Sequence, residues 1–367
     1  MIRQLKQFTL RLTAGANVAT VVLMLVAGFS DRIDPGLLPL LACMGMLFPF
    51  FLLANLLFLL FWLFCHWKSA WIPILGFVLA YVPINIYIPV RVMDTPPEGS
   101  LKLLSYNVHG YSGMQWGQNT FDSIFSYLLA QQADIVCLVE DNDTWRHSDV
   151  IFAEHFAHNK RVQISSNNRK LVNHIGLHTR FPIVGAERID LPSQTESNGA
   201  AAFLVKTATD TVMVVGCHLE NIHLNSQERS KYKKILKGEV EKDSAKTEGM
   251  NIVGKLSGAF KVRARQVEAL SKYIDEHRHN YPVLVCGDFN DTPISYSRHV
   301  IARHLTDCFQ TSGCGLGLSY NQKGFNFRID YLFCSEDFHP YSCQIDAKMG
   351  ASDHYPLICW LKKGHNP

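Results

Sequence analysis

The sequence lacks the cysteine spacings that mark two kinds of small domain. Its ten cysteines form no Cys-x-x-Cys pair of a zinc site and no regular disulfide framework. Where a cysteine lies on an apolar run, its thiol is usually a small buried hydrophobe. Five cysteines fit that description, namely Cys137, Cys217, Cys286, Cys334 and Cys359, and two more, Cys43 and Cys65, lie in longer apolar runs. Only Cys308, Cys314 and Cys343 remain as loop candidates for a disulfide bridge.

The chain also has little net charge. Its formal charge is +3 over 367 residues. A dedicated nucleic-acid binder usually carries a strong basic excess, so the overall charge gives no electrostatic footprint of that kind. No internal repeat is apparent either, which argues against a solenoid. The nature of a partner must therefore be sought in local motifs.

Three stretches contain no Asp, Glu, Lys or Arg at all: residues 12–30, 35–65 and 69–90. Each is long enough to cross a hydrocarbon core of roughly 30 Å as a helix. The alternative, buried helices of a large soluble fold, is disfavoured because only very short polar links join the three stretches. We therefore expect residues 1–91 to form a membrane anchor of three transmembrane helices.

The basic residues that flank these stretches predict an orientation. One side would carry Arg3, Lys6, Arg11 and Lys68, and the other Arg32 and Arg91. The excess of basic residues normally faces the cytoplasm. We expect an integral protein, of a bacterial inner membrane, whose C-terminal domain lies on the non-cytoplasmic side. The first stretch also resembles a signal peptide cleaved near Ala27 and Gly28, which would leave two helices and the same orientation.

After a short linker at 92–101, residues 102–367 alternate between β-like and helix-like segments. Residues 200–205 and 211–217 are predicted as two strands around a turn at Thr209–Asp210. Apolar residues recur at helical spacing in 263–277, which predicts a helix. The stretch 225–261, rich in Lys, Glu, Ser and Gly, is expected to be a solvated helix and loop, with a lid beside a site as the alternative. Together these elements predict an α/β domain.

Polar residues recur at the ends of the apolar runs or beside them. Three short sequence motifs are the most informative: Gly287-Asp288-Phe289-Asn290, Arg328-Ile329-Asp330-Tyr331 and Ser352-Asp353-His354. Earlier in the chain, three other runs end in Asn107, Glu140 and His218. We expect these groups to meet at one edge of a sheet, where they could hold a divalent metal and a phosphate.

The order Asn, Glu, His, Asp-x-Asn, Asp, Asp-His resembles that of the endonuclease/exonuclease/phosphatase (deoxyribonuclease I-like) superfamily, over roughly residues 102–362. This superfamily includes deoxyribonuclease I, apurinic endonucleases, neutral sphingomyelinases and inositol polyphosphate 5-phosphatases. The resemblance implies a four-layer α/β sandwich of two packed mixed β-sheets flanked by helices. It also implies hydrolysis of phosphate esters with Mg²⁺ or Mn²⁺, cations that prefer hard oxygen ligands.

The resemblance assigns roles to the residues of these motifs. Metal ligands would be Glu140, Asn107 and Asp353. Asp288 and Asn290, two apart and hence on one face of a strand, would orient the attacking water and the phosphate. Asp330 would fix the tautomer of His354, and His218 would contact the phosphate from the other side.

Three further residues are candidates for substrate binding. His109 occupies a position where some apurinic endonucleases carry a carboxylate ligand. Arg328 would clamp a phosphate, or else pair with an acid. Asn173 precedes a predicted strand and would line the cleft, or else pack or cap.

The predicted function is that of a membrane-anchored, metal-dependent phosphodiesterase or phosphatase, with a nuclease-like activity on nucleic acid as the first expectation. One alternative is a phosphohydrolase of phospholipid, sphingomyelin or inositol phosphate, favoured by the membrane tether. The other is a non-catalytic membrane binding or scaffold protein, for which at least one of the principal positions should have lost its functional residue. The oligomeric state is left open.

Overall fold

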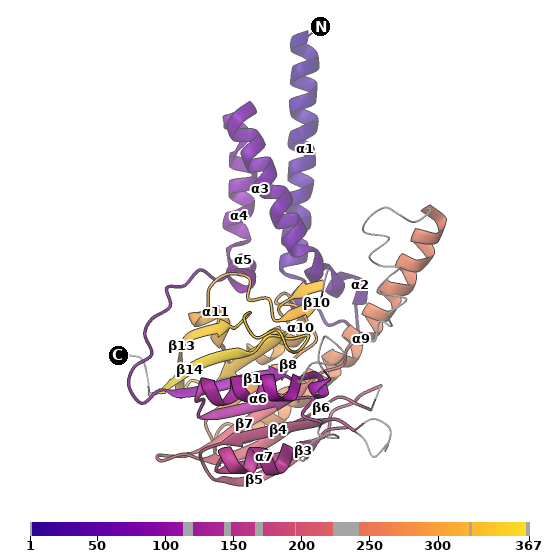
Figure 1. Cartoon of the computed structure of the whole chain (residues 1–367). Coiled ribbons are helices and arrows are strands. Elements are labelled where there is room, and N and C mark those ends of the chain that lie inside the picture. Colours follow the sequence, from indigo (N-terminus) through magenta and orange to yellow (C-terminus); the bar gives the residue numbers. More distant parts are fainter. Residues whose placement is uncertain are drawn as a thin grey trace.

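The structure is a computed structural model that describes residues 2–112, 120–142, 148–165, 172–194, 196–222, 242–322 and 325–364. A group of apolar helices projects from one end of a β-sandwich, and the N-terminus lies far from the sandwich (Figure 1). The helices come from the first quarter of the chain, and the sandwich from the remainder.

Two six-stranded mixed sheets make up the sandwich. The first has the strand order β13-β14-β1-β2-β4-β3 and the second β5-β6-β7-β8-β12-β9, with a separate hairpin of β10 and β11. The first sheet consists of β1 (Leu101–Asn107), β2 (Ile135–Val139), β3 (His158–Gln163), β4 (His174–Thr179), β13 (Phe338–Ile345) and β14 (Leu357–Lys363). The second consists of β5 (Ile183–Ile189), β6 (Gly199–Lys206), β7 (Thr211–His218), β8 (Val283–Asp288), β9 (Thr306–Asp307) and β12 (Asp330–Cys334). The hairpin is β10 (Tyr320–Gln322) and β11 (Phe325–Phe327).

Both faces of the central strands are buried, which explains why the sequence shows continuous apolar runs rather than alternation there. In β8, Leu284 and Cys286 belong to the core between the two sheets. Val283 and Val285 point to the other face and pack with residues of α9 (Lys242–His277) and α10 (Tyr296–Ile301). Helices α6 (Thr120–Gln131) and α7 (Ser148–His155) cover the outer face of the first sheet. The four-layer α/β sandwich predicted from the sequence is thereby confirmed.

The predicted pair of strands around Thr209–Asp210 is confirmed, since β6 and β7 are antiparallel neighbours in register from Gly199–His218 to Lys206–Thr211. The helix predicted at 263–277 is too short. It is the C-terminal part of α9, which begins at Lys242 and so includes more than half of the segment 225–261 expected to be an insertion. Residues 225–241 of that segment lie outside the described part of the chain.

The N-terminal helices are α1 (Ile2–Gly28), α3 (Phe48–Cys65), α4 (Trp71–Leu79) and α5 (Tyr81–Tyr87), with short turns η1 (Ser30–Arg32), α2 (Pro39–Ala42), η2 (Cys43–Leu47) and η3 (Trp67–Ser69) between them. By length and composition, Arg3–Arg32 and Pro39–Cys65 are two helices able to cross a membrane. The bent pair Trp67–Leu79 and Tyr81–Tyr87, at 65°, is a third if it acts as one span.

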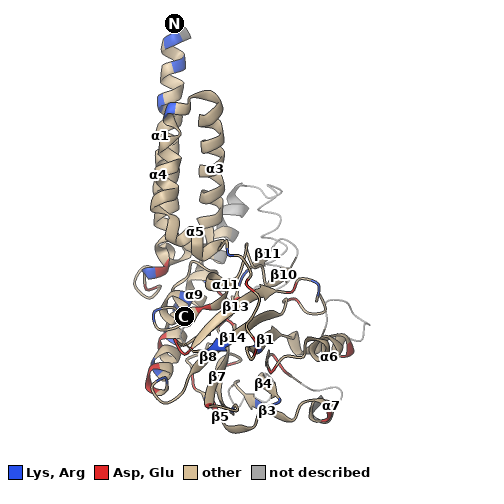
Figure 2. Cartoon of the chain, turned by 90° about the vertical axis from the view of Figure 1, so that its left-hand side faces the viewer, with Lys and Arg blue, Asp and Glu red and all other residues tan. Residues whose placement is uncertain are grey.

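Hydrogen bonds join the apolar helices to one another. Asn17 Nδ2 donates to Asn55 Oδ1 at 3.0 Å, and Trp62 Nε1 donates to Asn17 Oδ1 at 2.9 Å. Polar side chains that bond across helices stabilise helix association in a lipid environment. Lys and Arg gather near the N-terminal end of α1, away from the sandwich, and most of the remaining helical surface carries no charge (Figure 2).

The helices of the anchor pack directly on the sandwich. Ile294, which follows the Asp288 strand, lies in one apolar cluster with Phe48, Ile86 and Tyr87. Asp31 Oδ2 lies 3.4 Å from His299 Nδ1 of α10. The backbone N–H of Gly315, which follows α11 (Cys308–Ser312), donates to Pro89 O at 2.8 Å. These contacts fix the sandwich against one end of the anchor.

All ten cysteines are free. The five on apolar runs are buried, as expected. The bridge considered among Cys308, Cys314 and Cys343 is not formed: Cys308 and Cys343 are free thiols in the core between the sheets, and Cys314 is a free thiol on the surface.

Candidate active site

Strand register brings the predicted site residues to one end of the sandwich. In the second sheet, β7 and β8 run parallel with His218 opposite Asp288, and β12 pairs antiparallel to β8 with Asp330 opposite Asp288. In the first sheet, β1 and β2 run parallel, so Asn107 at the end of β1 lies beside the residue that precedes Glu140. Carboxyl ends of parallel strands meet at one edge, and here the edges of both sheets adjoin.

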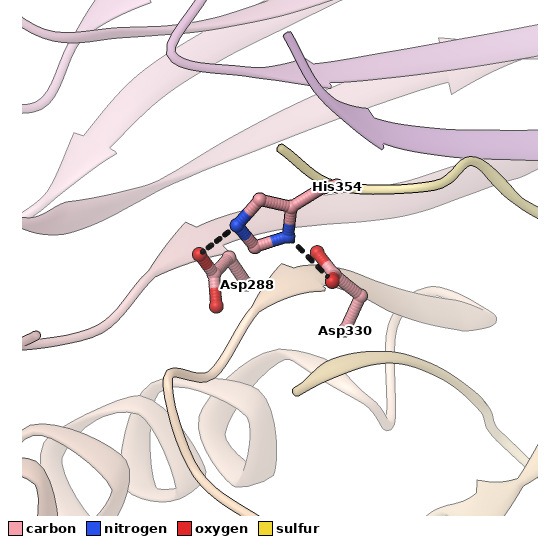
Figure 3. A group of neighbouring side chains, drawn as sticks. All are labelled: Asp288, Asp330 and His354. Carbon is pink, nitrogen blue, oxygen red and sulfur yellow. Dashed lines mark hydrogen bonds and ion pairs between the residues drawn. The ribbon is translucent and has the colours of Figure 1, made fainter. Parts of the chain in front are cut away.

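Asp330, His354 and Asp288 form a chain of polar groups at this edge (Figure 3). His354 Nδ1 lies 2.7 Å from Asp330 Oδ2, and its Nε2 lies 3.5 Å from Asp288 Oδ2. All three side chains are buried. The structure thus brings together the histidine and the carboxylate that the sequence paired.

These contacts set the charge of His354. Burial alone would lower the pKa of the imidazole, but the negative charges of Asp330 and Asp288 outweigh it and raise that pKa to about 10. Burial and the negative charge of Asp330 both raise the pKa of Asp288, and the positive charge of His354 opposes them. The net effect is a pKa of about 6 for Asp288. His354 is therefore an imidazolium at neutral pH, with one N–H held by Asp330 and the other directed into the site.

Two further carboxylates converge on the imidazole of His109. Its Nδ1 lies 3.6 Å from Glu140 Oε2 and 3.7 Å from Asp353 Oδ1. Burial would raise the pKa of Glu140, but the hydrogen bond from His109 and the charge of His218 lower it to about 2. The hydrogen bond to Glu140 in turn raises the pKa of His109. The place that Glu140 and Asp353 share, taken here by His109 Nδ1, therefore favours positive charge, and the two carboxylates are the hard oxygen ligands that Mg²⁺ or Mn²⁺ take.

Asn107 lies next to this point, but its side-chain amide directs its nitrogen, and not its oxygen, toward Glu140. Its Nδ2 donates to Glu140 Oε1 at 3.3 Å and to Asp288 Oδ2 at 3.2 Å, while its Oδ1 accepts from the His109 N–H at 3.0 Å. The two amide ends are nearly indistinguishable in shape, so the assignment depends on the surrounding hydrogen bonds. To offer oxygen to a metal beside Glu140, the amide would have to rotate.

Asp288, Asp330 and His354 also satisfy a simple proximity criterion for a metal site, since their ligand atoms lie within 4.8 Å of one another. Their atoms already contact one another, since His354 Nδ1 lies 2.7 Å from Asp330 Oδ2 and its Nε2 lies 3.5 Å from Asp288 Oδ2. This group and the Glu140–Asp353 pair are two neighbouring candidate metal positions.

His218 lies on the opposite side of Asp288. Its Nε2 is 3.7 Å from both Glu140 Oε1 and Asp288 Oδ2. Asn173 lies behind it, with its Nδ2 3.0 Å from His218 Nδ1 and 3.0 Å from Ser197 O. Asn173 is buried and is absent from the lining of the cavity, so it holds the histidine rather than a substrate.

Backbone geometry after β8 places Asn290. Gly287 has φ +133°, and a Cβ there would collide with the backbone of Cys217, so this position requires glycine. Asn290 itself has φ +52°, its N–H donates to Asp288 Oδ1 at 2.8 Å, and its Nδ2 donates to Leu219 O at 2.9 Å. Asp288 and Asn290 are thus locked to each other and to the end of β7.

A cavity of about 460 Å³ opens above these groups. Seven of the residues predicted for the site line it: His109, Glu140, His218, Asp288, Asn290, Asp353 and His354. Asn107, Asp330 and Asn173 do not line it and contact lining residues from behind.

Arg328 requires a correction. It is buried and does not line the cavity. Its Nη2 donates to Ile86 O at 2.5 Å and its Nη1 to Leu316 O at 3.1 Å, and its guanidinium lies over the Phe309 ring. Ile86 belongs to α5 of the anchor. Within the described part of the chain Arg328 forms no ion pair with an acid and does not face the cavity, and its hydrogen bond to Ile86 joins α5 to the sandwich.

Several lining residues were not expected from the sequence. Arg263 Nε lies 3.2 Å from Asp291 Oδ2, both side chains are 1% exposed, and both residues border the cavity. Tyr320, whose ring centroid lies 5.1 Å from that of His354, and Met46 also border it. Asp291 directly follows the Asp-Phe-Asn motif, which could have drawn attention to it. Nothing local marks Arg263 or Met46.

A second buried network supports Glu140. The neighbouring Asp141 accepts from Arg161 Nε and from the Tyr111 hydroxyl, each at 2.5 Å, and lies 3.2 Å from His178 Nε2. Glu140 has φ +56°, an uncommon conformation for a residue with a side chain. The fixed Asp141 side chain holds the backbone at this turn, and so directs Glu140 into the cavity.

Carboxylates, a buried Asp–His pair and a second histidine around one cavity are the kinds of groups that phosphoester hydrolases use. The model of the endonuclease/exonuclease/phosphatase family matches residues 104–354, more than half of the chain, so the chain belongs to this family. Residues 10–87 match a second family, described as a domain of unknown function. No curated protein matches the chain.

Solved structures share the fold at low sequence identity. The catalytic domain of human Nocturnin, with a bound sulfate anion, is 16% identical with a TM-score of 0.51, over 74% of this chain and 98% of that one. An endonuclease/exonuclease/phosphatase from Beutenbergia cavernae is 16% identical with a TM-score of 0.52, over 72% of each chain. D. rerio TDP2 complexed with a single-strand DNA product is 16% identical with a TM-score of 0.49, over 72% of this chain and 100% of that one.

Proposed function

We propose that this protein is a membrane-anchored phosphodiesterase that uses Mg²⁺ or Mn²⁺. The observation that carries the proposal is the convergence of Glu140 and Asp353 on one cation-favouring point, beside the Asp288–His354–Asp330 chain and in the same cavity. A bound divalent cation would neutralise charge on a phosphoryl oxygen or on the leaving group. Glu140 and Asp353 would hold it, with Asn107 after rotation of its amide.

The remaining residues act on water and on phosphate oxygens. Asp288, as the carboxylate, accepts a proton from a water that attacks phosphorus, and Asn290 holds that carboxylate in place. His354 donates its Nε2–H, which lies beside Asp288, to an equatorial oxygen, where negative charge builds in the transition state. His218 lies across Asp288 from His354, and so donates from the other side. Asp330 keeps His354 charged and oriented.

The first test is hydrolysis itself. The purified full chain in mild detergent should release p-nitrophenol from a phosphodiester, methyl p-nitrophenyl phosphate, when Mg²⁺ or Mn²⁺ is present. EDTA should abolish the release, and added cation should restore it. The reason is that only the cation, and not the acidic side chains that hold it, offsets the negative charge of the phosphate. Release that continues in EDTA would contradict a metal-dependent mechanism.

Residues 1–91 are proposed as the anchor, 92–101 as the linker and 102–367 as the catalytic domain. The apolar helices and the basic residues at the far end of α1 support this division and an exit from the cytoplasm. The predicted location is a bacterial inner membrane with the domain on its outer side. The motif order predicts a nuclease-like activity, with phospholipid, sphingomyelin or inositol phosphate as the alternative substrate.

Topology can be measured directly. Alkaline phosphatase folds and is active only outside the cytoplasm, so a fusion after Pro367 should be active in intact bacterial cells. Green fluorescent protein fused at the same junction should stay dark, since it does not mature there. A bright fluorescent fusion with an inactive phosphatase fusion would show that the orientation is inverted.

A further inference from the structure

The wall of the active-site cavity is built partly from the membrane anchor. Met46 belongs to η2, inside the helical stretch Pro39–Cys65 that is long and apolar enough to cross a membrane, yet it lines the cavity together with His354 and Glu140. Gly45, beside it, packs so closely on the backbone of Ile294 that a Cβ would collide there. The anchor segment is therefore a fitted part of the site rather than a tether at a distance.

The lining of the cavity is divided between charged and apolar groups. The charged or polar set comprises His109, Glu140, His218, Asn221, Arg263, Asp288, Asn290, Asp291, Thr292, Asp353 and His354. The apolar set comprises Met46, Ile222, Phe260, Phe327 and Ile329. Phe260 belongs to α9, which contacts both α2 and η2, so helix and anchor adjoin beside the cavity. Such a cavity is complementary to a molecule with a phosphate at one end and an apolar group at the other.

Exposed leucines precede Met46 in the chain and do not line the cavity. Leu37, Leu38 and Leu40, on the segment that leads into η2, are 77%, 54% and 66% exposed. Figure 1 shows α2, in which Leu40 lies, at the end of the sandwich that faces the anchor helices. Apolar side chains exposed at the base of membrane helices enter the boundary between head groups and acyl chains. The path into the cavity then begins at the membrane surface.

The anchor cannot swing the site away from that surface. Arg328 bonds to Ile86 O, Asp31 pairs with His299, and Gly315 bonds to Pro89 O, at three separate points of the sandwich. A soluble polyanion would gain nothing from a methionine of the anchor at its reaction centre, and its charged backbone would be desolvated there at a cost.

We infer that the substrate is a membrane amphiphile, a phosphate ester that carries an apolar chain, with its phosphate at Glu140 and His354 and its chain along Met46 and Phe260. The inference rests on the proposed phosphodiesterase function. Water adds to phosphorus, the P–O bond to the leaving group breaks, and the water's proton passes through Asp288 to the departing oxygen. The alkyl phosphate keeps its chain.

The test compares two diesters with the same leaving group, hexadecyl p-nitrophenyl phosphate and methyl p-nitrophenyl phosphate, on the full chain at fixed detergent concentration. The measured quantity is the ratio of kcat/KM for the hexadecyl ester to that for the methyl ester. We expect a ratio of at least about 10, because each buried methylene favours binding. Met46→Asn should lower that ratio about tenfold, in line with the burial of one methionine side chain.

Matched variants separate a local effect from a general one. Phe260→Asn should lower the ratio in the same way, Met46→Leu should preserve it, and Met93→Asn, outside this cavity, should leave it at the wild-type value. A wild-type ratio near 1, an unchanged ratio in both asparagine variants of the wall, or faster turnover of single- or double-stranded DNA than of the hexadecyl ester would overturn the inference. No release from either ester would overturn the proposed function as well.

Discussion

Removing either member of the Asp330–His354 pair should cut turnover strongly, and removing both should cost little more. Asp330→Asn and His354→Ala are each expected to lower kcat about 10²–10⁴-fold, the usual worth of a group that moves protons or stabilises charge in the transition state. Asp330 holds His354 Nδ1 at 2.7 Å and keeps the ring protonated. The two residues therefore act as a unit, and losses within a unit are not additive.

The measurement is kcat for methyl p-nitrophenyl phosphate in the wild type, the two single variants and the double variant, with folding checked by circular dichroism. Asp210→Asn is the matched control, since Asp210 lies at the other end of the hairpin from His218, where it pairs with Lys363. Its kcat should equal that of the wild type. Losses that multiply in the double variant would show that Asp330 and His354 act independently.

Glu140→Gln should remove metal binding and, with it, nearly all turnover. The substitution keeps the size of the side chain but removes the charge that converges with Asp353 on the cation point. Titration calorimetry with Mn²⁺ should show the wild-type binding heat lost in the variant, while the thermal unfolding midpoint changes little in metal-free buffer. Such cations are usually bound by one or two carboxylates and several waters. The loss of one carboxylate therefore leaves few protein ligands to hold the cation.

Glu154→Gln is the control for the Glu140 variant, because Glu154 is an exposed residue of α7. It should bind Mn²⁺ and turn over substrate like the wild type. Unchanged Mn²⁺ binding in Glu140→Gln would remove Glu140 from the metal site, and would leave its hydrogen-bonded contact with His109 as its principal role.

The local sequence pattern predicted most of the residues that line the cavity, but not all of the site. Each apolar run that ends in a polar residue is a local signal, and strands of one sandwich bring such ends to a common edge, so seven predicted residues line one cavity. The pairing of Asp330 with His354 was expected from chemistry, and the structure brings the two side chains into contact. Arg328 failed as a substrate residue, because its neighbours in sequence gave no indication that α5 would lie against it.

Composition and periodicity by themselves determined the apolar helices and an α/β domain, because both act over neighbouring residues. The order of the polar motifs added, by resemblance, the four-layer sandwich. Only the tertiary structure decided that Met46 of the anchor and Phe260 of α9 complete the cavity, that Asn173 stands behind His218, and that Cys308 and Cys343 are buried and free. These outcomes depend on contacts between residues far apart in the chain. Strand register, helix length and the packing of the helices on the sandwich are set by such contacts, which a pattern of neighbouring residues does not contain.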